Sequence, residues 1–343
     1  MEESLQRESE KLARSWMRHE AGWLRTYLVA GVEDPRLNLQ SIFSRHFLAR
    51  EAAGDGLGEL MEQEYRFAAA MTWLVRLAGL AAGTDELAVV LEALRRGADN
   101  AEGIEIPRWM VKLFATLPAR MGGLTLPNYI ESFLEGTRFE SGQVRPDEPS
   151  LNTFQALWRT ALSRFTLHAP RPLSVFEPAC GSANDYRFLE AYGLAPLLDY
   201  TGLDLCAKNT ENARSLFPHV RFETGNVFAL AAPDQSFDLC FVHDLFEHLS
   251  LEGLRAAVGE ICRVTRQGLC VNFFNLDEIA EHAVRPVEEY HWNTLSLGRT
   301  RELFRAHGFV GQAVNVSAFA RQRIGYEQTY NPKAYTLFLR RKT

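Results

Sequence analysis

Small residues alternate with larger ones in a turn that directly follows an apolar run ending at Glu177. The small residues are Ala179, Gly181 and Ala183. They let a ligand approach the backbone, where the N–H groups of a following helix are available as donors. A second carboxylate, Asp204, ends the next predicted strand, and an acid at this position can accept both hydroxyls of a ribose. This arrangement predicts a nucleoside-binding site.

The residue types around the turn indicate which nucleoside the site binds. A dinucleotide favours the pattern GxGxxG, which brings the backbone against a pyrophosphate, but residues 179 to 184 read ACGSAN. Glu177 would repel a phosphate and attract a cation. A nucleoside that carries ammonium and sulfonium groups fits such a turn, and S-adenosylmethionine is that ligand.

Methyl transfer from a sulfonium is an in-line displacement, and a hydroxyl or ammonium acceptor must lose a proton to a base. Candidate bases cluster where the fourth and fifth predicted strands end. We expect His243 and Asp244, which close the fourth strand, and His291, in the segment EEYHWNTLS, to be catalytic. Three further candidates lie near them, namely Asp277, Glu278 and His248.

Strands and helices alternate from residue 173 onward. This alternation predicts an α/β fold with a doubly wound, mostly parallel sheet of seven strands and helices on both faces. We expect strands at 173–178, 199–205, 220–225, 237–244, 268–275, 309–319 and 333–341, and helices at 184–193, 206–217, 251–265 and 297–308. The last two strands follow each other without a helix, which predicts an antiparallel hairpin with a long loop at the edge of the sheet.

The first 135 residues have helical periodicity nearly throughout and almost no strand signals. Helices are expected at 5–29, 57–80, 85–98, with Asp85 as N-cap, and 107–121. Residues 136–150 are rich in Gly, Pro and charges and are typical of a linker, and a helix is expected at 151–168. We therefore divide the chain into an all-helical N-terminal domain, 1–150, that ends in this linker, and a sheet domain, 151–343.

Composition narrows the classes of partner. The chain has 343 residues and a net charge of −6; residues 1–150 carry 17 Lys and Arg against 23 Asp and Glu, whereas the remainder carries 20 of each. An acidic front half disfavours nucleic acid as the partner. Its polar first residues predict no signal peptide, and Arg76 interrupts the most apolar stretch, so we expect a cytoplasmic protein without a membrane span. The five cysteines form no CxxC pair or zinc spacing, which predicts reduced thiols and no metal.

From about residue 170 to the end, five segments resemble the Rossmann-like, or class I, S-adenosylmethionine-dependent methyltransferases. VFEPACGSAND is similar to their first motif, an acid followed by GxGxG, and YTGLDL to their second, with Asp204 on the ribose. FETGNVFAL resembles the segment that meets the adenine, with Asn226 in place of an acid. SFDLCFVHDLFEHL with LRAAVGEICRVTRQGLCVNFF is similar to the fourth and fifth strands, and TLSLGRTRELFRAHGF to the helix before the terminal hairpin.

The resemblance implies a cofactor, S-adenosylmethionine, and its binding residues. These are Glu177, Ala179, Gly181, Ala183, Asp204, Leu205, Asn226, Val227 and His243. Alanine in place of two glycines is a mild steric change, and the amide oxygen of Asn226 can still accept a hydrogen bond from the adenine amine. The resemblance further implies methyl transfer to an O, N or C nucleophile of a small molecule. Helical N-terminal domains of related enzymes dimerise or cover the site, so a homodimer through the helical domain is expected.

Three alternatives come from other classes of protein. A NAD-dependent oxidoreductase would share the sheet and Asp204, but the third glycine is absent and the closing hairpin does not fit. A non-catalytic protein could bind S-adenosylmethionine in the sheet and use its helical domain for assembly. A protein or RNA methyltransferase is less favoured, because HDLF stands where amino-group nucleic-acid methylases have an Asn/Asp-Pro-Pro-aromatic motif, and because the front half is acidic.

Overall fold

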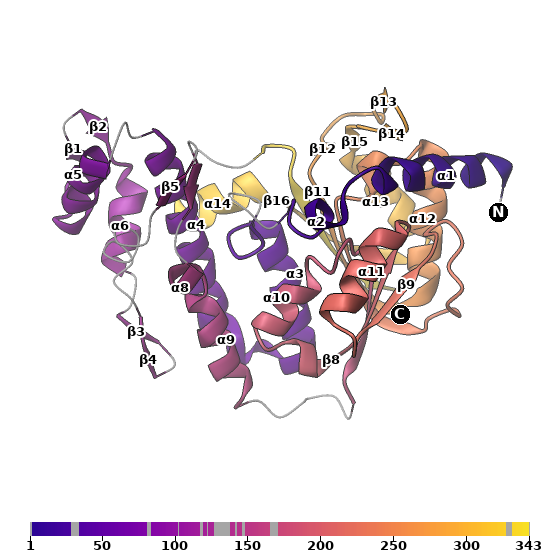
Figure 1. Ribbon diagram of the computed structural model, residues 1–343, viewed down its shortest axis with the longest axis horizontal. Helices are drawn as coiled ribbons and strands as arrows, with labels where there is room; N and C mark the ends of the chain where they lie inside the picture. Colours follow the sequence, from indigo (N-terminus) through magenta and orange to yellow (C-terminus); the bar gives the residue numbers. More distant parts are fainter. Residues whose placement is uncertain are drawn as a thin grey trace.

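A computed structural model describes residues 2–28, 34–80, 84–101, 103–116, 119–121, 123–126, 138–140, 143–145, 148–164, 171–326 and 331–342. The predicted seven-stranded sheet is present, in the order β16-β17-β11-β10-β7-β8-β9 (Figure 1). Its strands are β7 (Leu173–Pro178), β8 (Leu198–Asp204), β9 (Arg221–Thr224), β10 (Phe237–His243), β11 (Thr265–Phe273), β16 (Phe309–Asn315) and β17 (Tyr335–Arg341). The pairs from β9 to β11 are parallel, and β17 is antiparallel to both β11 and β16.

The sheet reverses its strand order at β7, which has β8 on one side and β10 on the other. Ligands of doubly wound sheets bind beyond the carboxyl ends of the strands at such a point. The chain therefore brings the turn after Glu177 and the end of β10 at His243 to adjacent places on one edge of the sheet.

One predicted detail of the terminal hairpin is wrong. The helix α14 (Val316–Ile324) lies between β16 and β17, where the sequence pattern favoured a strand to residue 319. Asn315 causes this change, because its side-chain oxygen accepts a hydrogen bond of 2.8 Å from the backbone N–H of Ala318 and so caps a helix. Gly325, with a φ of 82°, ends that helix.

Helices cover both faces of the sheet. They are α10 (Tyr186–Ala191), α11 (Ala207–Leu216), α12 (Leu251–Val264) and α13 (Leu297–Ala306), with short 3-10 turns at Ala195–Leu197 and Phe246–His248. Side chains alternate along β10: Cys240 and Val242 pack with α12 and α13, whereas Leu239 and Phe241 face the other core cluster. The segment between β11 and α13 forms two small strand pairs, β12 (Leu276–Asp277) with β15 (Leu295–Ser296), and β13 (Pro286–Val287) with β14 (Tyr290–His291).

The front half is largely helical, as predicted. Its helices are α1 (Glu3–Met17), α2 (Ala21–Leu24), α3 (Leu39–Ala53), α4 (Gly58–Leu80), α5 (Thr84–Arg95), α6 (Arg108–Thr116), α8 (Glu148–Leu151) and α9 (Thr153–Leu162), with a 3-10 turn at Asp55–Leu57. Five details differ from the predictions. No helix was predicted at the position of α3, and the predicted linker 136–150 contains a strand pair at 138–140 and 143–145 and the start of α8. The expected helix at 5–29 is broken between α1 and α2. Asp85 lies in the first turn of α5 rather than at its N-cap. Short strand pairs are present where few strand signals were seen, β1 (Asn100–Ala101) with β2 (Ile104–Glu105), β3 (Arg120–Met121) with β4 (Leu124–Thr125), and β5 (Arg138–Glu140) with β6 (Gln143–Arg145).

The helix α3 lies in the interior, between the other front helices and the sheet (Figure 1). Residues 39 to 49 of this helix are all buried. The side-chain oxygen of Asn38 caps its start by accepting from the backbone N–H of Gln40 at 2.9 Å. One hydrophobic cluster joins α3 and its neighbours to a face of the sheet. The front helices and the sheet therefore share a core.

Two other sequence predictions concern cysteines and membranes. All five cysteines are free and buried, as predicted. Among the described residues, no helix combines the length and apolar character needed to span a bilayer.

Candidate functional site

The turn after β7 has an unusual backbone. Ala179, Gly181 and Ala183 have φ values of 59°, 55° and 64°, which lie in the left-handed region where an L residue costs about 1–2 kcal/mol. A Cβ atom at position 181 would lie 2.9 Å from Nδ2 of Asn184. A side chain at 181 would therefore require Asn184 to shift and would add backbone strain like that of the alanines at 179 and 183.

Asp204 holds this turn in place from the end of β8. Its Oδ2 accepts a hydrogen bond of 2.9 Å from the backbone N–H of Gly181, and its Oδ1 accepts from the backbone N–H of Cys206 at 2.8 Å and from Nδ2 of Asn209 at 3.1 Å. Burial raises the pKa of Asp204, although these hydrogen bonds oppose the shift. The predicted ribose-binding acid thus joins the turn to the start of α11.

The carboxylate of Glu177 lies inside the sheet edge and is 2% exposed. Its Oε2 accepts a hydrogen bond from the hydroxyl of Tyr200. Burial, followed by repulsion from Asp185, raises the pKa of Glu177 well above its ordinary value. A cation placed nearby would stabilise the charged form of this group.

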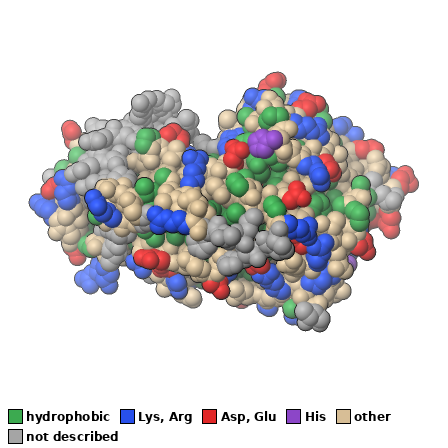
Figure 2. All heavy atoms as spheres, turned by 90° about the horizontal axis from the view of Figure 1, so that it is seen from below, with side chains coloured by type: hydrophobic (Ala, Val, Ile, Leu, Met, Phe, Trp, Pro, Cys, Tyr) green, Lys and Arg blue, Asp and Glu red, His purple; other side chains and the backbone are tan. Residues whose placement is uncertain are grey.

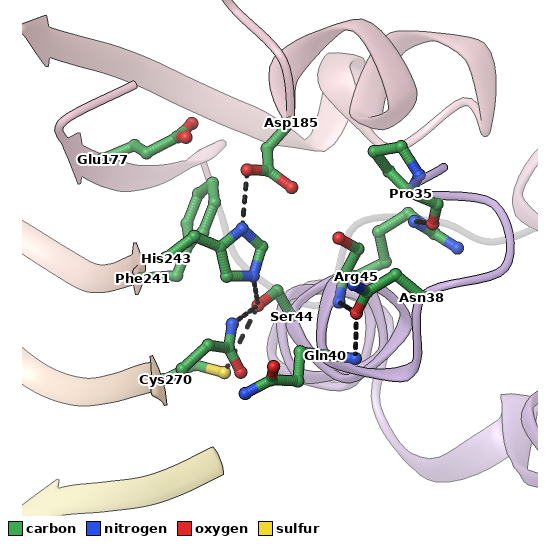
Figure 3. A network of polar contacts seen from close by, with 12 residues as sticks. Pro35, Asn38, Gln40, Ser44, Arg45, Glu177, Asp185, Phe241, His243 and Cys270 are labelled. Carbon is green, nitrogen blue, oxygen red and sulfur yellow. Dashed lines mark hydrogen bonds and ion pairs between the residues drawn. The ribbon is translucent and has the colours of Figure 1, made fainter. Parts of the chain in front are cut away.

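His243 forms the clearest contact of the site. Its Nδ1 is 2.6 Å from Oδ2 of Asp185, which follows the strained turn (Figure 3). Burial lowers the pKa of His243, but the Asp185 carboxylate outweighs burial, so that the pKa lies above 6.5. A neutral histidine whose ring a carboxylate orients, and whose imidazolium the carboxylate stabilises, is suited to take up a proton. Asp185 stands within the first motif but was not singled out by the sequence pattern.

Two residues of the front half reach the same place and were missed by the sequence analysis. Ser44 of α3 has its Oγ 3.0 Å from Nε2 of His243. Tyr27 follows α2, and its pKa is raised by burial and then by the charges of Asp204 and Asp244. Helix α3 and the segment of Tyr27 therefore lie beside the acids at the carboxyl ends of the strands.

The segment before Tyr27 is attached to α11. Nζ of Lys208 donates to the backbone oxygens of Met17 and His19 at 2.6 and 3.0 Å. Nδ2 of Asn212 donates to the backbone oxygen of Ala21 at 2.9 Å. Because Asp204 binds the start of the same helix, these contacts fix the N-terminal segment relative to the turn.

The other predicted cofactor-binding residues lie in the turns after β8 and β9. Leu205 and Val227 are partly buried against the core cluster on the α12 side of the sheet. The side-chain oxygen of Asn226 accepts a hydrogen bond of 2.9 Å from the backbone N–H of Phe228, so its first role in the fold is to shape its own turn.

The remaining candidate bases are not joined to His243. His291 lies in β14, where its backbone oxygen accepts a hydrogen bond of 3.2 Å from Nδ1 of His248. Asp277 forms an ion pair of 3.4 Å with Lys333, and its Oδ1 accepts from the backbone N–H of Glu278. Asp244, next to His243, has a φ of 46° and contributes to the raised pKa of His243.

Comparison with known proteins identifies the segment that contains the turn and His243. Residues 176–271 match the family model described as a methyltransferase domain. This match supports the resemblance of the segment to the class I S-adenosylmethionine-dependent methyltransferases. The cofactor of this family is S-adenosylmethionine. No curated protein matches the sequence.

The methyltransferase segment is also similar to solved structures, at low identity. A 1,6-didemethyltoxoflavin N1-methyltransferase from Burkholderia thailandensis is 17% identical, with 55% of this chain and 76% of that chain covered and a TM-score of 0.39. An S-adenosylmethionine-dependent methyltransferase from Mesorhizobium loti is 15% identical, with 50% and 92% covered and a TM-score of 0.39. The [4+2]-cyclase SpnF is 17% identical, with 56% and 82% covered and a TM-score of 0.39.

The strained turn and the acids around it have features that would fit S-adenosylmethionine. The small residues of the turn leave its backbone open to a ligand, and Oδ1 of Asn184 is buried without a hydrogen-bond partner among the described residues. In the same described part of the chain, Asp185 is paired with His243, whereas Glu177 and Asp204 accept hydrogen bonds from neutral groups. Burial raises the pKa of both Glu177 and Asp204, and a bound ammonium or sulfonium group would stabilise their charged forms.

A separate cavity lies away from this site. It measures about 550 Å³ and is bordered by α3, α4, α14 and the strands β16 and β17. Its lining includes Phe43, Tyr65 and Phe338 but none of the predicted cofactor-binding residues. The acids and the strained turn at the strand-order reversal therefore lie outside this cavity.

Glu247, in the segment FEHL, is a buried acid near the site. Its Oε1 accepts from the backbone N–H of Asn275 at 3.1 Å, while its Oε2 is buried and has no hydrogen-bond partner among the described residues. Burial, and then the charge of Asp244, raises the pKa of Glu247 to about 8. The folded state therefore binds the proton of Glu247 more tightly than the unfolded state does.

This shift predicts a loss of stability as the pH rises. The contribution of Glu247 to the free energy of unfolding is complete below its ordinary pKa near 4.5. It is lost as the pH rises through about 8. Relative to the variant Glu247→Gln, the wild-type free energy of unfolding should fall by up to about 1.4 kcal/mol per pH unit. Urea unfolding at pH 5.5, 6.5 and 7.5 measures this, with the exposed Glu302→Gln as control. Equal slopes for the wild type and Glu247→Gln would contradict the neutral state of Glu247.

Proposed function

We propose that the chain transfers a methyl group from S-adenosylmethionine to an O, N or C nucleophile of a small molecule. The observation that carries this proposal is the Asp185–His243 pair, whose atoms are 2.6 Å apart, beside the acidic turn of a methyltransferase domain. When bound, S-adenosylmethionine supplies an electrophilic methyl group on a sulfonium. The protein supplies the binding site, the orientation of the acceptor and a base.

The cofactor-binding residues have separate tasks in this proposal. Asp204 accepts the ribose hydroxyls while it keeps its hydrogen bond to Gly181. Glu177 provides negative charge for the ammonium group. Asn184, whose Oδ1 is buried without a partner among the described residues, offers an acceptor next to the turn. Leu205, Asn226 and Val227 lie in the turns that would flank the adenine. Ala179 and Ala183 leave room at the backbone.

His243 acts as the base. Asp185 binds Nδ1, which fixes the ring so that Nε2 faces away from the turn and toward α3 (Figure 3). Asp185 also stabilises the imidazolium that forms when Nε2 takes the acceptor's proton. Asp244 adds a further negative charge near the ring. His291 has no hydrogen bond to His243 in the described structure, and its proposed role is to contact the acceptor from the loop before α13.

The front half supports a small acceptor. Helix α3 and the segment of Tyr27 cover the carboxyl ends of the strands, where a polymer would need an open surface. On the face shown in Figure 2, Lys and Arg side chains are interspersed with Asp and Glu, and they form no continuous basic band. A nucleic acid would require clustered cations along its path. A covered site also excludes water from the reacting groups.

We propose three further properties for the whole chain. It is a cytoplasmic protein, with a helical domain at residues 1–150 and the methyltransferase domain at 151–343. The helical domain closes the site and forms a homodimer. Sedimentation velocity on the full chain tests the dimer, since a mass near 38.8 kDa would indicate a monomer.

Replacing Asp204 by alanine should lower the affinity for S-adenosylmethionine at least tenfold, a loss of about 1.4 kcal/mol. The variant removes the acceptor of the ribose hydroxyls and releases the N–H of Gly181, which disturbs the turn. Calorimetric titration measures the affinity. Asp199→Ala, an exposed acid on the same strand, is the matched control. Unchanged affinity in a folded Asp204→Ala protein would contradict the assignment of this residue.

A screen for the acceptor tests the proposed reaction. The wild-type protein is incubated with S-adenosylmethionine and a library of phenols, alcohols, amines and carbon acids, and formation of S-adenosylhomocysteine is measured. We expect turnover with members of this library and none with bulk RNA or a protein lysate. Turnover on RNA or protein alone would refute the small-molecule assignment, and cofactor binding without any turnover would favour a non-catalytic role.

A further inference from the structure

Ser44 completes a chain of polar side chains with His243 and Asp185 (Figure 3). Its Oγ is 3.0 Å from Nε2 of His243, whose Nδ1 is 2.6 Å from Asp185. The three residues come from α3, the end of β10 and the strained turn. Helix α3 thus supplies a side chain to the proposed base, in addition to covering it.

A row of residues across three strands fixes the position of Ser44. His243, Asn272 and Thr336 are register neighbours on β10, β11 and β17. Nδ2 of Asn272 donates to Oγ of Ser44 at 2.9 Å, and the hydroxyl of Thr336 donates to Oδ1 of Asn272 at 2.6 Å. The orientation of the amide of Asn272 is therefore set by Thr336, and Ser44 must receive its hydrogen bond.

The first turn of α3 is attached to the same strands. Nε2 of Gln40 donates to the backbone oxygens of Phe273 and Tyr335, at 3.1 and 3.0 Å. Gln40 and Ser44 are four residues apart and so lie on the same face of the helix. Ser44 is held rigidly at Nε2 because the helix is fixed one turn away.

Ser44 can form a hydrogen bond with Nε2 of His243 in both protonation states of the ring. In the neutral ring, Nδ1–H donates to Asp185 and Nε2 accepts from the Ser44 hydroxyl. In the imidazolium, Nε2–H donates to Oγ, and the hydroxyl of Ser44 can turn to Sγ of Cys270, which is 3.6 Å away. Neither state leaves a buried ring nitrogen without a partner, a situation that would otherwise cost stability.

We propose that Ser44 is a positioning residue of the proton-accepting centre. Its hydroxyl donates to Nε2 of neutral His243, and once Nε2 has taken up the proton, Oγ accepts Nε2–H of the imidazolium while the hydroxyl hydrogen turns to Cys270. This inference rests on the proposed function and narrows it. The acceptor is a hydroxyl or an N–H group, which loses a proton on methylation, and not a tertiary amine or a thioether.

The balance of the step is simple. The acceptor oxygen or nitrogen forms a bond to the methyl carbon, the bond from that carbon to sulfur breaks with its electron pair left on sulfur, and the acceptor's proton moves to Nε2 of His243. The side chain of His243 is 17% exposed, so the ring remains accessible to an acceptor. Release of the proton to solvent restores the neutral ring.

The order Asp–His–Ser also occurs in acyl-transfer enzymes, where serine is the nucleophile. Ser44 is 2% exposed, stands inside a helix and receives the hydrogen bond of Asn272 at its Oγ. These features bury Oγ and engage it in a hydrogen bond, which is unlike an exposed nucleophile. We therefore expect a fluorophosphonate probe to leave the protein unlabelled, and labelling of Ser44 would overturn its role as a positioning residue.

The decisive experiment is a pH titration of histidine side chains by NMR, on the full chain. The signal of His243 is assigned by its loss in His243→Gln. Cys270 on β11 contacts Oγ of Ser44 at 3.6 Å. The groups that shift the pKa of His243 are Asp185, Asp244 on its own turn, and the backbone oxygen of Gln40 on α3. None of these is altered by removing the Ser44 hydroxyl.

Ser44→Ala should lower the pKa of His243 by about 0.7 pH unit, because the bond lost from the imidazolium is charge-assisted and about twice as strong as the one lost from the neutral ring. Asp185→Asn should lower it further, by about 1–3 pH units. Ser41→Ala, on the same helix, is the matched control and should leave it unchanged. Ser44→Thr keeps a hydroxyl and should restore a value near that of the wild type.

A pKa in Ser44→Ala equal to that in Ser41→Ala overturns the inference. If Ser44→Ala does not fold, Ser44→Cys replaces it, because the thiol fills the space but bonds weakly, and the same direction of shift is expected. The proposed function and the role of Ser44 can be refuted separately. Absence of cofactor binding refutes the proposed function, whereas cofactor binding together with an unchanged pKa in Ser44→Ala refutes only the role of Ser44.

Discussion

Replacing His243 by glutamine should lower the rate of methyl transfer to a hydroxyl or N–H acceptor by about 10²- to 10⁴-fold, the usual contribution of a positioned base. The glutamine amide can contact Asp185 and Ser44, but it cannot take up a proton. The effect should fall mainly on kcat, with a smaller change in the KM for S-adenosylmethionine. Steady-state kinetics with the acceptor found in the screen measures both constants.

The control for this variant is His219→Gln, which alters an exposed histidine on the loop after α11. Its rate should match that of the wild type. The wild-type rate should rise with pH through the pKa of His243, which lies above 6.5, because the ring must be neutral to accept a proton. A full rate in His243→Gln, with the same pH profile, would show that another group is the base.

Replacing Glu64 by glutamine should destabilise the protein by about 3–5 kcal/mol, as expected when one partner of a buried ion pair is removed. Glu64, on α4, is 0% exposed and accepts hydrogen bonds from Arg45 at 3.0 Å, from His46 at 2.6 Å and from Nε1 of Trp158 at 2.6 Å. All three neighbours are donors, so the NH₂ group of a glutamine would face another donor. The buried charge of Arg45 would also lose its opposite charge.

The matched control is Glu62→Gln, because Glu62 lies on the same helix but is paired near the surface, with Arg66 and Arg323. We expect it to change stability by less than about 1 kcal/mol. The charges around Glu64 lower its pKa to about 2 even though burial alone would raise it. The contribution of Glu64 to the free energy of unfolding is therefore present above pH 4.5 and is lost as the pH falls through about 2. Equal urea midpoints for Glu64→Gln and the wild type would refute the role of this network.

The Glu64 network also links stability to the proposed chemistry. Arg45 and His46 follow Ser44 directly on α3, and Trp158 belongs to α9. The network therefore joins α3 to two other front helices, while Gln40 joins α3 to the sheet. A variant that loosens the network should displace Ser44 as well as lower the free energy of unfolding.

Much of the sheet was predictable because its signals are local. Buried parallel strands give continuous apolar runs, and the helices between them give a 3.6-residue period. The end of each strand is then known, which was sufficient to place Glu177, Gly181, Asp204 and His243 on one edge. The helix α14 was missed because its start depends on Asn315, whose capping hydrogen bond is not visible in the apolar pattern of residues 309–319.

The contribution of the front half could not be predicted, because it depends on contacts between distant parts of the chain. Ser44 and His243 are 199 residues apart, and the helix α3 that carries Ser44 was not among the helices predicted from the sequence. One local signal was present in LQSIFSRHF. Gln40 and Ser44 are spaced by four and therefore share one face of a helix, but Ser41 and Arg45 beside them are polar as well, so composition did not set the pair apart. The role of Asp185 required the structure for the same reason.

Calorimetric titration of the full chain with S-adenosylhomocysteine tests the central claim most directly, because the product of the cofactor binds without any acceptor. The account predicts saturable binding at one site per chain, weakened at least tenfold in Asp204→Ala and unchanged in Asp199→Ala, and no binding of NADH. No heat with either S-adenosylmethionine or S-adenosylhomocysteine, together with saturable binding of NADH, would contradict it.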